Sequence, residues 1–153
     1  MWYLLGEVGD RGSTIETTSV IGLVVAKTKL DPIGAIRDLR MLLKERPWEF
    51  RYTLKLVPVQ KVVAAHLEEI EREAMNLAGG IGLEEKFRIT VEKRHTPMSS
   101  KEIIDRVAKG IERAVDLESP DRILLVEIIG ELAGLALISP EDILSVEREK
   151  RSG

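Results

Sequence analysis

The chain has no cysteine among its 153 residues, which excludes disulfide bonds, thiolate zinc sites and cysteine nucleophiles. Aromatic residues are scarce, with two Trp, two Tyr and two Phe, and this disfavours a surface that reads single strands mainly by base stacking. The 23 basic and 26 acidic residues nearly cancel. The chain therefore lacks the overall basic excess that would indicate a nucleic-acid partner.

Long apolar segments are also lacking. No run approaches the roughly 20 residues that span a bilayer. The N-terminal MWYLLGEVGD lacks the basic stretch and apolar core of a secretory signal. Because the absence of cysteine also fits a reducing compartment, we expect a cytoplasmic protein without membrane association.

Recognisable catalytic and metal-binding motifs are missing as well: the sequence has no P-loop, no GxSxG and no HExxH. Its two histidines, His66 and His95, lie far apart, so a zinc site would need a carboxylate-rich ligand set that the spacing does not suggest. The four glutamates at 68–73 fit a solvated helix face better than a metal site. We therefore expect no catalytic residue, no metal and no cofactor.

Regular apolar patterns, in contrast, are present along most of the chain. Asp31 followed by Pro32 is typical of a helix start. Residues 50–57 alternate as in a half-buried strand whose outer face carries Arg51 and Lys55. The patterns predict strands at 2–8, 20–27, 50–57, 87–92, 122–130 and 132–138. They predict helices at 32–45, at 63–77 and from 99 or 100 to 114, with a further turn of helix at 140–142. A loop is expected at 9–19 and a charged tail after 146.

The order of these elements indicates the fold class. Strands and helices alternate at irregular intervals, and no glycine-rich phosphate loop follows the first strand. This favours an α+β fold, an α/β sandwich, over a Rossmann fold. A soft boundary near Pro58 separates a small N-terminal β-α-β unit from a C-terminal α-β-α-β-β unit.

Glu127 is the one acidic residue inside the apolar run RILLVEIIG at 122–130. A carboxylate in an apolar wall is costly unless it is paired. The residue could be a functional acid with a perturbed pKa, or it could reach the strand edge or pair with a basic residue of a neighbouring strand.

Charge is sorted along the chain even though it nearly cancels overall. Residues 37–61 contain seven basic and three acidic side chains, and residues 86–101 contain five basic and one acidic. Between them, residues 62–85 contain six acidic side chains and one basic. Such sorting is typical of a protein with a phosphate-binding face.

The segment 93–101 adds local geometry to this charge. It leads from the end of a strand to a serine-capped helix start, where free N–H groups favour an anion. An ordinary surface loop with a capped helix would look the same. The candidate RNA-binding residues here and on the two basic strands are Arg51, Lys55, Arg88, Lys93, Arg94, His95, Ser99, Ser100 and Lys101.

FRITVEKRHTPMSSKEIIDRVAKGI, followed by VDLESPDRILLVEIIGELAGLALI, resembles the THUMP domain, in particular that of the adaptor proteins for tRNA cytidine acetylation. The run VDL-x-x-PD-R-x-x-LVEIIG and the later SPEDILSV carry most of the resemblance. The upstream GLVVAKTKLDPIGAIRDLRMLLKERP and LKLVPVQ are similar to the segment that precedes the domain in those proteins. The resemblance covers roughly residues 20–148.

The resemblance implies a truncated ferredoxin-like unit at 1–57, since residues 9–19 are too short and too poor in apolar pattern for that unit's first helix. It implies a THUMP domain at 58–148 and a charged tail at 149–153. The family binds tRNA at the acceptor stem and 3′ end, and the adaptors have no catalytic centre. They help a separate RNA acetyltransferase form N4-acetylcytidine.

We therefore expect a non-enzymatic tRNA-binding adaptor with an RNA cytidine acetyltransferase as partner. Two alternatives remain. One is a ligand-sensing regulatory module on a ferredoxin-like sheet, which would need an apolar pocket, and the other is a general RNA-binding protein without an enzyme partner. Steep weakening of tRNA binding by salt would favour an RNA-binding function over ligand sensing.

Overall fold

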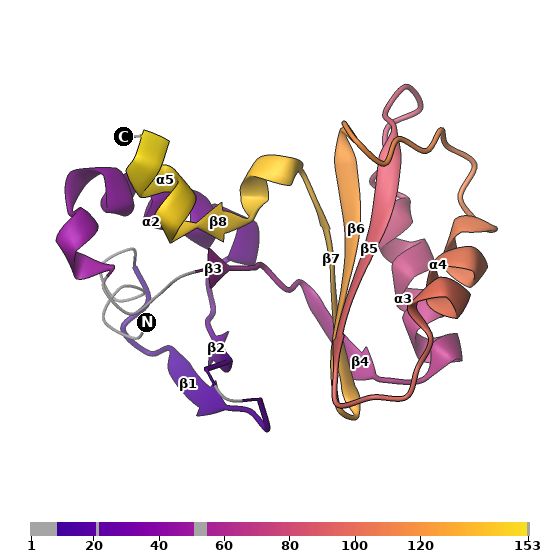
Figure 1. Ribbon diagram of the computed structural model, residues 1–153, viewed down its shortest axis with the longest axis horizontal. Coiled ribbons are helices and arrows are strands. Elements are labelled where there is room, and N and C mark those ends of the chain that lie inside the picture. Colours follow the sequence, from indigo (N-terminus) through magenta and orange to yellow (C-terminus); the bar gives the residue numbers. More distant parts are fainter. Residues whose placement is uncertain (1–8, 21, 51–54, 153) are drawn as a thin grey trace. The chain divides into compact units, whose positions relative to one another are not determined.

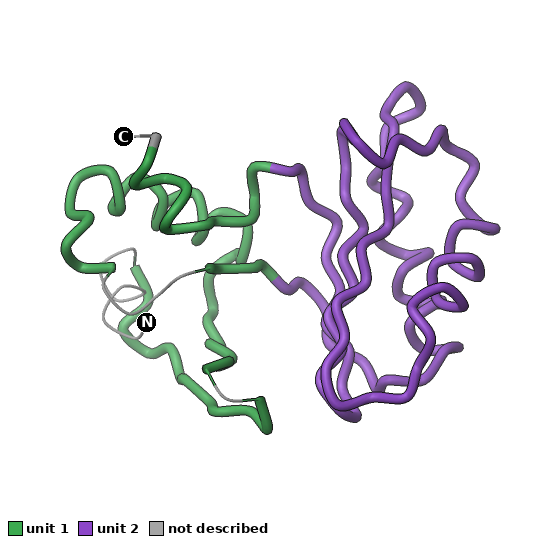
Figure 2. Tube along the Cα trace, viewed as in Figure 1, with its two compact units in different colours: residues 1–58, 141–153 green, residues 59–140 purple. Residues whose placement is uncertain are grey.

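The computed structural model describes residues 9–20, 22–50 and 55–152. The chain divides into two compact units (Figure 2). The first unit comprises residues 1–58 and 141–153, and the second comprises residues 59–140.

The described residues of the first unit form a hairpin, two helices and a two-residue strand pair. Strand β1 (Thr14–Thr17) pairs antiparallel with β2 (Val24–Lys27), and β3 (Lys55–Leu56) pairs antiparallel with β8 (Leu144–Ser145). Helices α2 (Pro32–Glu45) and α5 (Val146–Ser152) pack against each other, and short 3-10 turns occupy Pro47–Glu49 and Pro140–Asp142. The buried core is formed by Ile36, Leu39, Leu42, Leu43, Phe50, Leu144 and Val146.

Helix α2 begins and ends where its local sequence predicts. The Asp31 side chain accepts a hydrogen bond of 2.8 Å from the Gly34 N–H, which satisfies one of the free donors at the helix start. The helix stops at Glu45, two residues before Pro47. These signals act within one turn, so the sequence alone reveals them.

The segment expected to be a charged tail is largely helical, because residues 146–152 form helix α5. Arg40 of α2 holds the segment. Its Nε lies 3.0 Å from Glu149 Oε1, and its Nη2 donates to the carbonyls of Glu141 and, at 3.3 Å, Ile143. Residues 141–148 therefore group with the first unit rather than with the predicted domain at 58–148.

The second unit is a four-stranded sheet with two helices on one face (Figure 1). Its strands are β4 (Lys61–Ala64), β5 (Phe87–Arg94), β6 (Arg122–Ile129) and β7 (Leu132–Ile138), and its helices are α3 (Leu67–Ala78) and α4 (Ser100–Ala108). The strand order is β4-β7-β6-β5, in which only β5 and β6 are parallel. The α+β class predicted from the sequence is confirmed.

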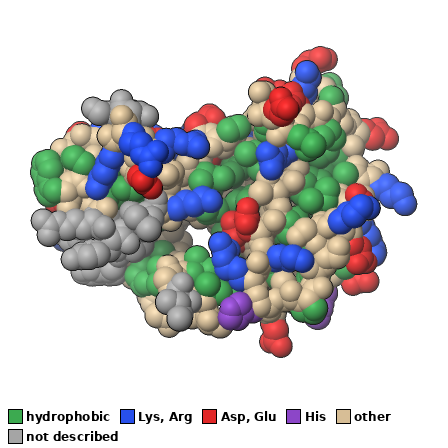
Figure 3. Space-filling view, in the orientation of Figure 1, with side chains coloured by type: hydrophobic (Ala, Val, Ile, Leu, Met, Phe, Trp, Pro, Cys, Tyr) green, Lys and Arg blue, Asp and Glu red, His purple; other side chains and the backbone are tan. Residues whose placement is uncertain are grey.

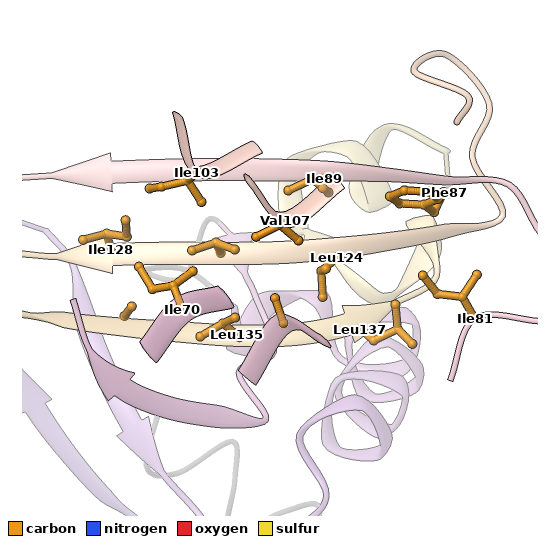
Figure 4. Close-up of a cluster of buried hydrophobic side chains, with 13 residues drawn as sticks. Ile70, Ile81, Phe87, Ile89, Ile103, Val107, Leu124, Ile128, Leu135 and Leu137 are labelled. Atoms are coloured by element: carbon orange, nitrogen blue, oxygen red, sulfur yellow. The ribbon is translucent and has the colours of Figure 1, made fainter. Parts of the chain in front are cut away.

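Apolar side chains from α3 and α4 meet alternate residues of the strands in a continuous core (Figure 4). Ile70 of α3 and Val107 of α4 are both fully buried against Leu124 and Ile128 of β6. On β5 the odd-numbered residues Phe87, Ile89 and Val91 pack into the same core. The even-numbered residues therefore point to the face that α3 and α4 leave uncovered.

Several predicted elements have different bounds. The helix expected from residue 63 begins at Leu67, because Val63 belongs to β4 and reaches the core from a strand. The spacing of Val63 from the apolar residues of α3 matches a helix by coincidence. The β-branched pair Val62-Val63 suits a strand better. The loop expected at 9–19 contains β1, and the strand expected at 20–27 spans only Val24–Lys27.

The expected strand at 2–8, and residues 51–54 of that at 50–57, lie outside the described residues; within the latter, Lys55 and Leu56 form β3. Within the part of the chain that the structure describes, no helix is long and apolar enough to cross a membrane.

Candidate nucleic-acid interface

The segment with the most candidate residues links the end of β5 to the start of α4. Lys93 and Arg94 are the last two residues of the strand, and His95 follows with a φ of 58°. That left-handed conformation is uncommon outside glycine, although histidine adopts it more readily than most residues. Ser99 then caps α4, since its side chain accepts a 3.2 Å hydrogen bond from the Glu102 N–H.

Lys93 and Arg94 diverge because neighbouring residues of a strand point to opposite faces. Lys93 is exposed, and its Nζ donates a 2.7 Å hydrogen bond to the Met98 carbonyl, across the loop. Arg94 points to the face of the sheet opposite α3 and α4, where its Nη1 lies 3.3 Å from Glu127 Oε2. Lys93 is therefore hydrogen-bonded within the loop, and Arg94 is paired on the face of the sheet.

The ion pair with Arg94 distinguishes the interpretations of Glu127. The Glu127 side chain is 15% exposed and lies on an inner strand. Pairing with a guanidinium offsets part of the cost of removing its carboxylate from water. The observed contact is the expected pairing with a basic residue of a neighbouring strand.

The main-chain ends of β5 and β6 are also joined here. The Gly130 N–H donates a 2.9 Å hydrogen bond to the Arg94 carbonyl. Gly130 has a φ of 58°, which glycine adopts without strain. This contact ties the turn between β6 and β7 to the start of the candidate loop.

Lys101 lies one residue into α4, and its side chain is 86% exposed. Its Nζ donates a 2.8 Å hydrogen bond to Asp105, one turn further along the helix. This hydrogen bond, with the attraction of the Asp105 charge, raises the pKa of Lys101 above its ordinary value. The Lys101 ammonium is therefore charged at neutral pH and already hydrogen-bonded to Asp105.

The remaining candidates are not brought to this loop. Arg88 lies six residues before Arg94 on the same strand, and its Nη1 donates a 2.9 Å hydrogen bond to the Leu117 carbonyl. Lys55 is exposed on β3 of the first unit. Arg51 lies outside the described residues. The structure thus gathers Lys93, Arg94, His95, Ser99, Ser100 and Lys101 at one end of β5.

Sequence reasoning missed two arginines that join separate segments of the second unit through main-chain carbonyls. Arg122 donates to the carbonyls of Gly80, Leu137 and Ile138, and Arg113 donates to those of Ile81 and Gly82. A carbonyl acceptor belongs to every residue type. The sequence therefore carries no signal that identifies these partners.

The viewed face of the second unit is electrostatically mixed. Figure 3 shows basic side chains interspersed with acidic ones there, without one continuous basic patch. A groove between α3 and α4 is similarly mixed, since Arg106 of α4 pairs with Glu71 of α3 at 2.8 Å. Among the described residues, no group of three or more His, Asp and Glu side chains is placed to hold a metal ion.

Residues 64–137 match the family model of the THUMP domain. No curated protein matches the chain.

Among solved structures, PH1313 from Pyrococcus horikoshii is 20% identical with a TM-score of 0.63, and the match covers 94% of this chain and 45% of that one. A "predicted N6-adenine-specific DNA methylase" from Listeria monocytogenes is 14% identical with a TM-score of 0.55, over 88% of this chain and 35% of that one. TrmN from Thermus thermophilus is 25% identical with a TM-score of 0.45, and the match covers 61% of this chain and 31% of that one. The chain spans less than half the length of these three proteins, and the first two likenesses support the fold alone.

Proposed function

Since residues 64–137 are a THUMP domain, which implies RNA binding, we propose that the chain is a tRNA-binding adaptor. In this proposal it presents tRNA to a separate RNA acetyltransferase that forms N4-acetylcytidine. The domain match is the observation that supports RNA binding. The adaptor role is supported by the resemblance of residues 115–130 and 139–146 to the acetylation adaptors.

The end of β5 supplies the groups that a phosphate backbone needs. Lys93 and Lys101 place exposed ammonium groups on either side of the loop. Arg94 adds a guanidinium, whose planar set of donors suits a phosphate. Such contacts position an RNA without reading its sequence. The scarcity of aromatic residues agrees with this mode, because duplex RNA is recognised by shape, phosphates and 2′-hydroxyls more than by stacking.

We propose further that the chain has no catalytic centre of its own and acts by proximity, holding the tRNA in register with the enzyme. The carboxylates Glu127 and Glu71 are engaged in ion pairs. The glycines at 79, 80 and 82 follow α3, and Gly130 joins two strands. None of these begins a helix after a strand, which is the arrangement that binds the phosphates of acetyl-CoA in many transferases.

Binding titrations with a tRNA transcript at several salt concentrations test the RNA-binding part. The logarithm of the binding constant should fall linearly with the logarithm of salt, by about 0.7–0.9 per phosphate contact. Lys101→Ala should weaken binding and lower that slope by about one contact. Lys109→Ala is the matched control, because it removes an exposed ammonium just past the other end of the same helix. Equal effects of both variants, or negligible tRNA binding at every salt concentration, would refute the proposal.

A reconstitution tests the adaptor part. Acetylcytidine in tRNA is measured with the chain alone, with a purified RNA acetyltransferase alone, and with both. We expect product to rise only in the combined reaction. Product from the chain alone would show an enzyme. No gain from adding the chain would leave an RNA-binding protein without this partner.

A further inference from the structure

Arg94 is accessible, but it is already paired. Its side chain is 38% exposed, whereas that of its partner Glu127 is 15% exposed and lies on the inner strand β6. The carboxylate is thus held by the sheet, and the guanidinium at the strand end is open to solvent on one side. A ligand from solvent can reach Arg94 more easily than it can reach Glu127.

A second carboxylate lies beside the pair. Glu92 and Glu127 are register partners on the parallel strands β5 and β6, so both point to the same face as Arg94, opposite α3 and α4. One guanidinium therefore has two acidic neighbours on this face. A carboxylate and a phosphate use the same planar set of guanidinium donors, so a phosphate approaching Arg94 meets both a competitor and repulsion.

We propose that Glu127 competes with RNA phosphate for Arg94, and that it thereby sets the affinity and selectivity of this end of the sheet for RNA. The inference rests on the proposed function, since it concerns the same RNA-binding residues. An RNA that contacts the loop and the helix start together can offset the cost of displacing Glu127. A polyanion that makes only one or two contacts cannot, so the competition favours a structured RNA over an unstructured one.

Glu127→Gln tests this proposal because it keeps the shape of the side chain and removes the charge that holds Arg94. Binding is measured by titration at low salt with two probes, a tRNA transcript and a single-stranded oligouridylate. We expect the variant to bind tRNA about three- to tenfold more tightly. The gain should be larger for oligouridylate, so discrimination between the probes should fall. A variant that merely damages the fold would lose affinity instead.

Two comparisons separate release of Arg94 from a general loss of negative charge. Glu92→Gln removes an equal charge at the neighbouring register position and leaves the ion pair in place, so its gain should be clearly smaller. In an Arg94→Ala background, Glu127→Gln should give no gain. A gain that persists without Arg94, or that Glu92→Gln matches, would overturn the proposal.

The controls also distinguish this proposal from the proposed function. A wild-type chain that binds no tRNA would contradict the proposed function itself. Wild-type binding, combined with unchanged or weaker binding by Glu127→Gln, would remove only the competition. Thermal unfolding shows whether the variant is folded. If Glu127→Gln is not folded, Glu127→Thr gives the same test with a side chain that suits a strand.

Discussion

Two arginines of β5 point to the same face of the sheet, yet they have different kinds of partner. Arg88, near the start of the strand, donates to the neutral carbonyl of Leu117, whereas Arg94, at its end, faces the carboxylate of Glu127. A carbonyl leaves the arginine charged and ties it to one loop. A carboxylate neutralises the charge and can be replaced by another anion. The comparison leads us to expect that the partner, more than exposure or strand position, decides whether such an arginine stays fixed in the fold or can exchange its partner for a ligand.

The contrast extends to the two ends of the sheet. The end where β5 and β6 begin is held by arginine side chains on main-chain carbonyls, with Arg122 and Arg113 beside Arg88. The end where these strands finish is held by the Ser99 cap and the hydrogen bond from Gly130 to Arg94. We therefore expect changes at the first end to affect stability, and changes at the second to affect RNA binding more.

The largest effect should come from Val107→Asp, which removes the core beneath both ends. Val107 is fully buried, and an unpaired charge there should cost several kcal/mol, on the order of the whole stability of a small domain. Thermal unfolding should show loss of the cooperative transition of the second unit. Lys109→Asp, just past the end of the same helix but exposed, should unfold close to wild type. An unchanged transition in Val107→Asp would mean that α4 packs with another face.

Arg122→Met tests the first end. Methionine keeps the apolar stem and removes the donors to the carbonyls of Gly80, Leu137 and Ile138. We expect a loss of about 1–2 kcal/mol in the free energy of unfolding, with an unchanged salt slope of RNA binding. The control is Arg72→Met, whose exposed pair with Glu69 should contribute about 0.5 kcal/mol or less. A changed salt slope in Arg122→Met would contradict the division between the two ends.

Ser99→Ala tests the second end. It removes the acceptor for the Glu102 N–H and should cost about 1 kcal/mol of stability. Ser99→Asp restores an acceptor and should recover that stability, because a negative charge also favours a helix start. It should at the same time weaken RNA binding by repelling phosphate. Equal RNA binding by the Ala and Asp variants would show that the helix start does not contact RNA.

The smallest expected effect is the loss of the stabilisation by Asp116 at acidic pH. Asp116 accepts hydrogen bonds from the N–H groups of Ser119 and Glu118, which lower the pKa of its carboxyl, with a further contribution from Lys86. A lowered folded-state pKa means that the carboxylate stabilises the fold above its unfolded pKa of about 3.9. This contribution is lost as pH falls through the folded pKa.

Asp116→Asn should therefore unfold at a lower temperature than wild type at neutral pH, and the difference should shrink below about pH 4. Asp121→Asn is a suitable control, because the Asp121 side chain accepts one main-chain hydrogen bond, from Lys86, where Asp116 accepts two. A difference that is constant with pH would exclude the carboxylate charge as its cause.

The two ends also show what a sequence can reveal about a candidate site. A serine cap at Ser99 or Ser100 was expected because the signal lies within a few residues of the helix start, and the structure assigns it to Ser99. The acidic partner of Arg94 was not identified, because Glu127 is 33 residues away and reaches it only through the register of β5 and β6. Glu127 itself stood out as an acid in an apolar run, and pairing with a neighbouring strand was among its expected roles.

Local pattern by itself determined the α+β class, the start of α2 at Pro32, the cap of α4 and the paired strands β6 and β7. These features depend on residues a few positions apart, whose preferences act in any context. Only the tertiary structure decided that residues 146–152 form a helix held by Arg40, and that Arg94 faces a carboxylate. Each of these depends on groups that are distant in sequence and become neighbours when the chain folds, so the physical information is absent from any short window of residues.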